Sequence, residues 1–266
     1  MLLYGSEVWG YENLEILERV HLQFCKRILN LRLSTPNFMV YGELGRHHLN
    51  IRVQLRMISF WCKLIQNENK LSGILYKLMF NLQANDDYDF RWISHIRSIF
   101  DRTSFGYIST NQIQVKFCNL KPLLFERLRD QFIQVWISDI ENSSRGQFYA
   151  IFKTEFCYEN YLSEFGRKQI SKLRTSNCKM PIETGMWQNI SREDRIRHLC
   201  REGVGHEYHY LFLCKNKAVF ELIQKYIQRY YLLNPNINKM VGILSRCNVK
   251  LLSNIALFVN KLNKLF

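Results

Sequence analysis

The chain carries few residues that break a helix, and this constrains its fold more than any other feature. Four prolines occur in 266 residues, at positions 36, 122, 181 and 235. Apolar residues recur every three or four positions along most of the chain, which is the period of a helix with one buried face. No convincing alternation of apolar and polar residues marks a strand. The sequence therefore predicts a mainly α fold: a multi-helix bundle followed by a second helical unit.

The expected helices cover most of the chain. In the first half they span 12–31, 50–67, 71–82, 90–100 and 122–138, with a short helix ending at Gly42. In the second half they span 147–162, 167–174, 217–232, 237–245 and 249–266. The segment 106–110 breaks the pattern, and 143–146 is the clearest linker. We therefore expect two domains, residues 1–145 and 146–266.

Two apolar stripes define the buried faces of the longest helices. The first stripe consists of Leu17, Val20, Phe24, Ile28 and Leu31. The second, near the end of the first domain, consists of Leu124, Leu128, Phe132 and Val135. Trp136 follows the same helical spacing, so core packing is a better interpretation for this side chain than stacking on a base.

Charge and composition favour a polyanionic partner. The chain has 37 basic and 23 acidic residues, a net charge of +14, and 14% aromatic residues. A basic chain with many aromatic residues points to non-specific binding of RNA or DNA. No signal peptide and no apolar run of membrane-spanning length stand out. Six of the eight cysteines lie in apolar or amphipathic stretches without a disulfide spacing, which suits a reducing compartment. We expect an intracellular protein, in the nucleus or cytoplasm, without a membrane or small-molecule partner.

The spacing Cys200-x8-His209-x4-Cys214 supplies three of the four ligands of a tetrahedral zinc site. A cysteine at position 197 would complete the set, but the residue there is Arg197, which cannot bind a metal. A relaxed turn would bring in His206 as the fourth ligand. His198 is only two residues from Cys200, too close to replace the first cysteine across a tight turn, and a water molecule is a third option. The candidate zinc ligands are Cys200, His206, His209 and Cys214. The competing interpretation is two buried thiols and a histidine in a small helical subdomain.

Several short segments of the sequence resemble, in the same order, segments of one known protein family. The sequence reads LYGSEVWG at 3–10, FCKRIL at 24–29, STPN at 34–37, LRTSNCKMPIETGMW at 173–187 and EYHYLFLC at 207–214. Together they resemble the C-terminal region of the reverse transcriptase polyprotein of non-LTR retrotransposons of the Jockey type. In that family this region comprises the thumb that follows the catalytic palm and a Cys/His segment similar to a zinc knuckle.

The resemblance implies a palm upstream of residue 1, so Met1 would be a start inside a longer ancestral frame. By the same resemblance, the C-terminal part helps to hold template RNA or target DNA during target-primed reverse transcription. The chain departs from the family at Cys178, which replaces a histidine, at Met186, which replaces an arginine, and at Arg197, which replaces the first zinc cysteine.

Basic helical faces are the expected contacts with nucleic acid. On the thumb they would follow the phosphates of a template–primer duplex, although an ordinary solvated face is an equally good interpretation. The candidate residues are Arg19, Lys26, Arg27, Arg52, Arg56, Lys63, Arg174 and Trp187. Glu183 is interpreted as structural, either capping a helix or pairing with Arg174.

No catalytic arrangement is recognisable in the sequence. There is no nucleophile with a base, no glycine-rich phosphate loop, and the pair Asp86–Asp87 lies in a polar loop without the surroundings of a polymerase site. We therefore do not expect an enzyme. Three functions stay open: a palm-less reverse transcriptase fragment that binds nucleic acid, an inert relic of a transposable element, and a zinc-dependent nucleic-acid-binding module.

Overall fold

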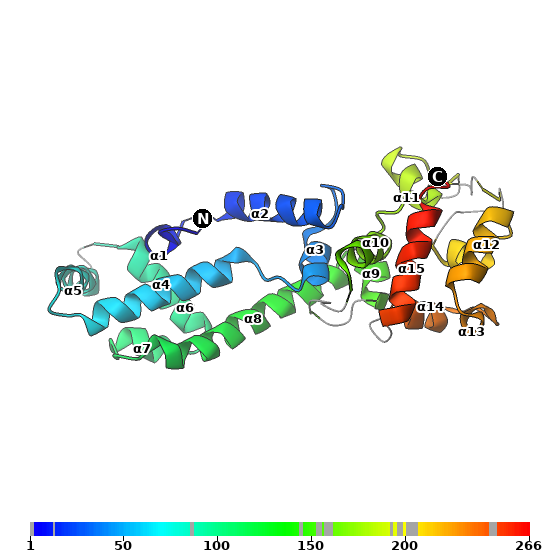
Figure 1. Ribbon diagram of the computed structural model, residues 1–266. Coiled ribbons are helices and arrows are strands. Elements are labelled where there is room, and N and C mark those ends of the chain that lie inside the picture. The colour runs from blue at the N-terminus through cyan, green and yellow to red at the C-terminus, as the bar shows by residue number, and fades with distance from the viewer. Residues whose placement is uncertain are drawn as a thin grey trace. The chain divides into compact units, whose positions relative to one another are not determined.

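The computed structural model describes residues 3–12, 14–85, 88–143, 146–152, 156, 162–191, 194–195, 199–200, 207–244 and 249–266. Within these ranges every regular element is a helix, so the predicted mainly α fold is confirmed (Figure 1). The chain divides into two compact units. Unit 1 comprises Met1–His21 and His47–Ile137, and unit 2 comprises Leu22–Arg46 and Ser138–Phe266. The expected boundary near residue 145 stays a prediction, because Ser144 and Arg145 lie outside the described residues.

Unit 1 is built around an apolar core that contains a series of side-chain hydrogen bonds. Its helices are α1 (Ser6–Trp9), the first half of α2 (Glu15–Ile28), α4 (Leu49–Gln66), α5 (Leu71–Ala84), α6 (Arg91–Arg102), α7 (Gly106–Thr110) and most of α8 (Phe117–Glu141). The Trp61 ring lies 4.9 Å from that of Phe100, and its Nε1 donates to the Tyr76 hydroxyl at 2.9 Å. Tyr76 in turn donates to Gln112 at 2.8 Å. These bonds satisfy the polar atoms that burial of Trp61 and Tyr76 would otherwise leave unpaired.

Unit 2 is organised around its last helix. Its elements are the end of α2, α3 (Asn37–Leu44), the end of α8, α9 (Gly146–Phe152), α10 (Glu164–Arg174), α11 (Pro181–Trp187), the π-helix η1 (His209–Leu213), α12 (Lys217–Tyr226), α13 (Arg229–Leu232), α14 (Ile237–Leu244) and α15 (Val249–Leu262). Helix α15 packs against α10, α12 and α14. Its buried residues recur at helical spacing, from Leu251 and Leu252 through Ile255 and Val259 to Leu262. A helix with such a wide apolar face is suited to the centre of a unit.

Helix α2 buries a different face from the one expected. Val20 and Phe24, two members of the predicted stripe, are 47% and 58% exposed. The buried positions are instead Leu14, Glu18, His21, Leu22, Cys25, Lys26 and Leu29. Polar partners make this face possible: Glu18 accepts hydrogen bonds from the backbone N–H of Leu49 at 2.8 Å and contacts His21 at 3.1 Å. Tertiary hydrogen bonds therefore outweigh the simple apolar pattern here.

Helix α8 follows its predicted stripe only in part. Leu124 and Leu128 are buried, but Val135 is 60% exposed and Trp136 takes its place in the core. The prediction that Trp136 is a core residue is therefore confirmed. Three short elements lie outside the expected helices. They are α7, at the predicted break over 106–110, and α11 and η1, between the helices expected at 167–174 and 217–232. The single helix expected over 217–232 is interrupted at Ile227 and Gln228, between α12 and α13.

Among the described helices, none is by itself long and apolar enough to cross a membrane. Helices α14 and α15 meet the length and composition requirement only together, as a pair bent by 101°.

Candidate functional site

Cys200, His209 and Cys214 come together in unit 2 as the sequence spacing predicts. Their ligand atoms all lie within 4.8 Å of one another. Cys200 Sγ and His209 Nε2 lie 3.2 Å apart. His209 and Cys214 are buried, whereas Cys200 is half-buried. Two thiols and an imidazole at one point form a donor set that zinc prefers.

A π-turn sets the relation between His209 and Cys214. The backbone N–H of Cys214 donates to the carbonyl of His209 at 3.0 Å, which is the i→i+5 bond that closes such a turn. The wider turn brings the two side chains to one side of the backbone. Just before it, the Tyr208 hydroxyl donates to the carbonyl of Pro235 at 2.7 Å and holds the start of the turn in place.

Asn216 links the segment that carries Cys200 to the start of α12. Its side-chain oxygen accepts from the backbone N–H groups of Ala218 and Val219, and so caps α12. Its side-chain nitrogen donates to the carbonyl of Leu199 at 2.9 Å, next to Cys200. One residue therefore begins a helix and fixes the segment that carries the first thiol.

The three residues fit a zinc ion with little adjustment. In a tetrahedral site with Zn–S near 2.3 Å, neighbouring ligand atoms are about 3.5–4 Å apart. The separations in this cluster reach no more than 4.8 Å. His206, His198 and Arg197 lie outside the described residues, so the fourth ligand stays a prediction.

Cys178, at one of the positions where the sequence departs from the retrotransposon family, is a core thiol. It is 1% exposed, and Asn263 Nδ2 lies 3.9 Å from its sulfur. Burial, with a smaller effect from the carboxylate of Glu207, raises the pKa of Cys178 to about 12. Burial also raises the pKa of Glu207 itself. The spacing of motif residues gave no signal for this buried carboxylate.

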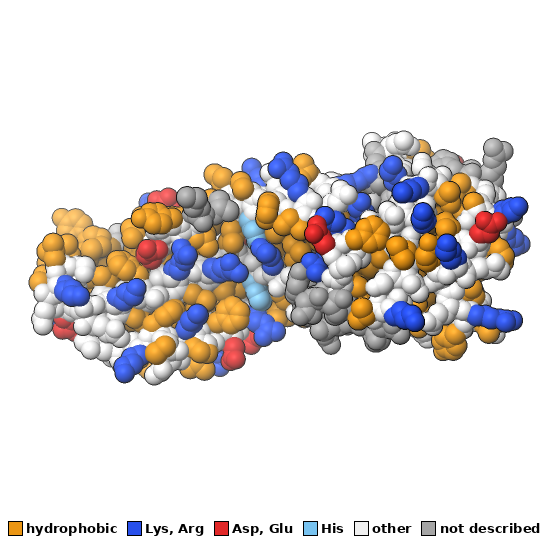
Figure 2. Space-filling view, in the orientation of Figure 1, with side chains coloured by type: hydrophobic (Ala, Val, Ile, Leu, Met, Phe, Trp, Pro, Cys, Tyr) orange, Lys and Arg blue, Asp and Glu red, His pale blue; other side chains and the backbone are white. Residues whose placement is uncertain are grey.

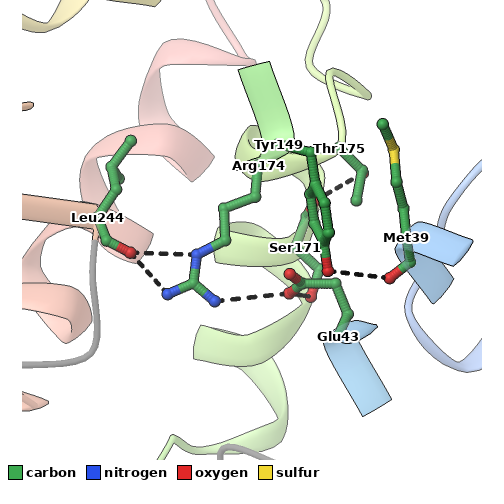
Figure 3. A network of polar contacts seen from close by, with 7 residues as sticks. All are labelled: Met39, Glu43, Tyr149, Ser171, Arg174, Thr175 and Leu244. Carbon is green, nitrogen blue, oxygen red and sulfur yellow. Dashed lines mark hydrogen bonds and ion pairs between the residues drawn. The ribbon is translucent and has the colours of Figure 1, made fainter. Parts of the chain in front are cut away.

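Arg174 was expected to contact nucleic acid, and the structure corrects this. Its side chain is fully buried, and its Nε and Nη2 donate to the carbonyl of Leu244 at 3.1 and 2.6 Å (Figure 3). Its Nη1 lies 3.7 Å from the Glu43 carboxylate, which also accepts from the Ser171 hydroxyl at 2.6 Å. Arg174 therefore pairs with Glu43. Glu183 lies in the first turn of α11.

Lys26 is the second corrected residue. It is 6% exposed, and its Nζ donates to the carbonyl of Leu33 at 2.8 Å and to the Asn37 side chain at 2.9 Å. Burial lowers the pKa of this lysine. Its ammonium group stabilises the turn after α2 and does not reach a phosphate.

The remaining basic candidates lie at the surface. They are Arg19 and Arg27 on α2, and Arg52, Arg56 and Lys63 on α4. Arg56 also donates to the carbonyl of Leu3. The side chain of Trp187 lies outside the described residues, although its backbone ends α11.

The two units differ strongly in charge. Unit 1 contains 13 basic and 11 acidic residues, whereas unit 2 contains 24 basic and 12 acidic residues. Figure 2 shows Lys and Arg side chains spread over the visible face, with fewer acidic side chains between them. Most of the charge excess thus belongs to the unit that also contains the Cys/His cluster.

Comparison of the chain with protein-family models, curated proteins and solved structures found no match.

Proposed function

We propose that this chain binds RNA or DNA without sequence specificity, and that it derives from a non-LTR retrotransposon reverse transcriptase without its palm. The observation that carries the binding proposal is the excess of 24 basic over 12 acidic residues in unit 2. A surface with that excess attracts a phosphate backbone and releases its counterions. The origin rests on the order of the sequence segments alone, and in this proposal the chain binds rather than polymerises.

The test is the affinity for labelled mixed-sequence RNA and DNA as salt rises from about 50 to 200 mM. Each phosphate contact adds about −0.7 to the slope of log K against log salt for a single strand. We expect a steep slope that is the same for unrelated sequences. Weak binding that does not change with salt would instead support the inert relic.

The Cys/His cluster favours a second candidate function, in which a bound zinc ion stabilises unit 2. Zinc supplies folding energy in structural sites of this kind, and it does so only when its ligands are deprotonated. We propose that Cys200, His209 and Cys214 are three of the ligands, because their ligand atoms already lie within 4.8 Å of one another.

The test is the zinc content per chain of the protein and of an Arg197→Cys variant, with Cys214→Ser as the control. One zinc ion in both of the first two proteins, and none in Cys214→Ser, supports a site completed by another ligand. Zinc only in Arg197→Cys would mean that the site is lost in the present chain. Zinc in neither would contradict the placement of the site.

A further inference from the structure

Three lysines share one surface of unit 2. Lys168 and Lys172 are four residues apart on α10, which makes them neighbours on one face of that helix. Lys179 follows a few residues after the end of α10 and is exposed. Burial lowers the pKa of Lys172, and the electrostatic effect of Cys178 raises it. The positive charges of Lys168 and Lys179 lower the pKa further. The backbone of Lys179 is held beside α15, the helix against which α10 packs.

The C-terminal end of α15 adjoins this surface. Asn263 Oδ1 accepts from the backbone N–H of Lys179 at 3.0 Å, so the two segments are in direct contact. Lys261 and Lys264 lie within one helical turn of Asn263, and both are exposed. Figure 2 shows Lys and Arg side chains gathered over this end of α15. We call Lys168, Lys172, Lys179, Lys261 and Lys264 the lysine cluster.

The helix that carries Lys168 and Lys172 is held firmly on its inner side. Ile170 and Leu173 are in the core, and α10 packs directly against α15. Arg174 bonds the end of α10 to Leu244 and Glu43. A rigid support lowers the ordering cost of binding, because only the lysine side chains need to be immobilised.

An aromatic ring lies on the same face of α10. Phe165 is 42% exposed and stands one turn before Lys168. Exposed aromatic rings beside basic residues offer stacking surfaces to unpaired bases, whereas a duplex keeps its bases stacked inside. An acidic residue interrupts the surface: Glu164 forms an ion pair with Lys168 at 2.5 Å.

We propose that the lysine cluster binds the phosphates of single-stranded nucleic acid, with Phe165 stacking on a base. This inference rests on the proposed nucleic-acid binding and assigns it to α10 and α15 instead of the basic face of α4. Lysine ammonium groups act on phosphates as point charges, so these contacts do not read sequence. The preference for single strands over duplexes comes from Phe165, because only unpaired bases are free to stack on it.

The first test compares two triple variants of equal charge change. Lys168→Gln/Lys172→Gln/Lys179→Gln should lower affinity for a labelled single-stranded RNA about tenfold or more and reduce the salt slope by about 2. The control, Lys70→Gln/Lys77→Gln/Lys116→Gln, changes three exposed lysines of unit 1 and should change affinity less than about twofold. Circular dichroism checks that both variants remain folded.

Two single variants sharpen the test. Glu164→Gln should raise affinity, because it removes the carboxylate that is paired with Lys168. Phe165→Leu should lower affinity for single strands about fivefold, leave the salt slope unchanged and leave duplex binding unchanged.

The failures are distinguishable. If the unaltered protein shows no salt-dependent binding, the proposed function fails. If the unaltered protein binds but both triple variants lose affinity equally, the lysine cluster is not the site. The same follows if Arg52→Gln/Arg56→Gln/Lys63→Gln abolishes binding while Lys168→Gln/Lys172→Gln/Lys179→Gln does not. Equal affinity for single strands and duplexes would contradict the assigned ligand class.

Discussion

At the scale of single residues, Arg174 has the largest structural role of the basic side chains described above. We predict that Arg174→Met destabilises the protein by about 3–5 kcal/mol, because it leaves the buried Glu43 carboxylate without its positive partner. Urea unfolding followed by circular dichroism measures the change. Arg52→Met, at an exposed position, is the matched control and should remain within about 0.5 kcal/mol.

A second variant separates lost charge pairing from lost packing. Adding Glu43→Gln to Arg174→Met removes the unpaired carboxylate, so the double variant should be more stable than Arg174→Met alone. Equal stability of the single and double variants would show that packing, not the ion pair, sets the effect.

Cys178 gives a prediction for alkaline pH. Its thiol ionises near pH 9.0 when unfolded but only near 12 in the folded protein, so unfolding releases a proton between these values. The free energy of unfolding should therefore fall as pH rises from about 9, by up to about 1.4 kcal/mol per pH unit from this group. In Cys178→Ala the free energy of unfolding should fall less steeply with pH, because this thiol no longer contributes. Unfolding curves at several pH values compare the two proteins, and identical slopes would contradict the prediction.

At the scale of elements, Asn216 joins the cap of α12 to the segment that carries Cys200 of the Cys/His cluster, and two variants separate these roles. Asn216→Ala removes both the cap of α12 and the bond to Leu199, and should cost about 1 kcal/mol of stability. Asn216→Asp keeps an oxygen for the cap but loses the donor to Leu199. Both variants should bind zinc about 10–100-fold more weakly, because the segment at Cys200 is freed. Zinc titration and thermal unfolding measure the two effects; unchanged zinc affinity in Asn216→Asp would contradict the second role.

The elements also show where sequence reasoning succeeds. On α4 the helical spacing predicts a buried stripe of Ile51, Leu55, Ile58, Cys62 and Ile65, and all of these are buried except Leu55, which is half-buried. Helix α2 differs because Glu18 and Lys26 find partners inside the protein and enter the buried face. Helical periodicity cannot anticipate such partners, since they come from segments distant in the chain. The Cys/His cluster was predictable because its three ligands are close in sequence, whereas the π-turn that aligns two of them was not.

At the scale of the whole molecule, metal removal should act on one unit. If zinc binds, chelation should lower hydrogen-exchange protection in η1, α12 and α15, which share the core of unit 2. The loss should be about 2–3 kcal/mol when free zinc was about a hundredfold above its dissociation constant. Amides of α4 and α6 in unit 1 serve as the internal control. Equal loss of protection in both units would argue against a site confined to unit 2.

A count over the two predicted domains already assigns most of the positive charge to the second. Residues 1–145 contain 18 basic and 14 acidic residues, and residues 146–266 contain 19 and 9. The fold sharpens this contrast, because unit 2 also takes in Leu22–Arg46 and leaves unit 1 with 13 basic and 11 acidic residues. The expected basic face on α4 followed from local spacing and lies in the nearly balanced unit.

The bonds of Arg174 also set an order of events during synthesis. Glu43 leaves the ribosome long before Leu244, and translation at about 5–20 residues per second puts roughly 10–40 seconds between them. During that interval Leu22–Arg46 has emerged without the C-terminal partners that complete its unit. The nascent chain consequently exposes Met39, Val40 and Leu44 to solvent and to chaperones until residues from Ser138 onward have emerged.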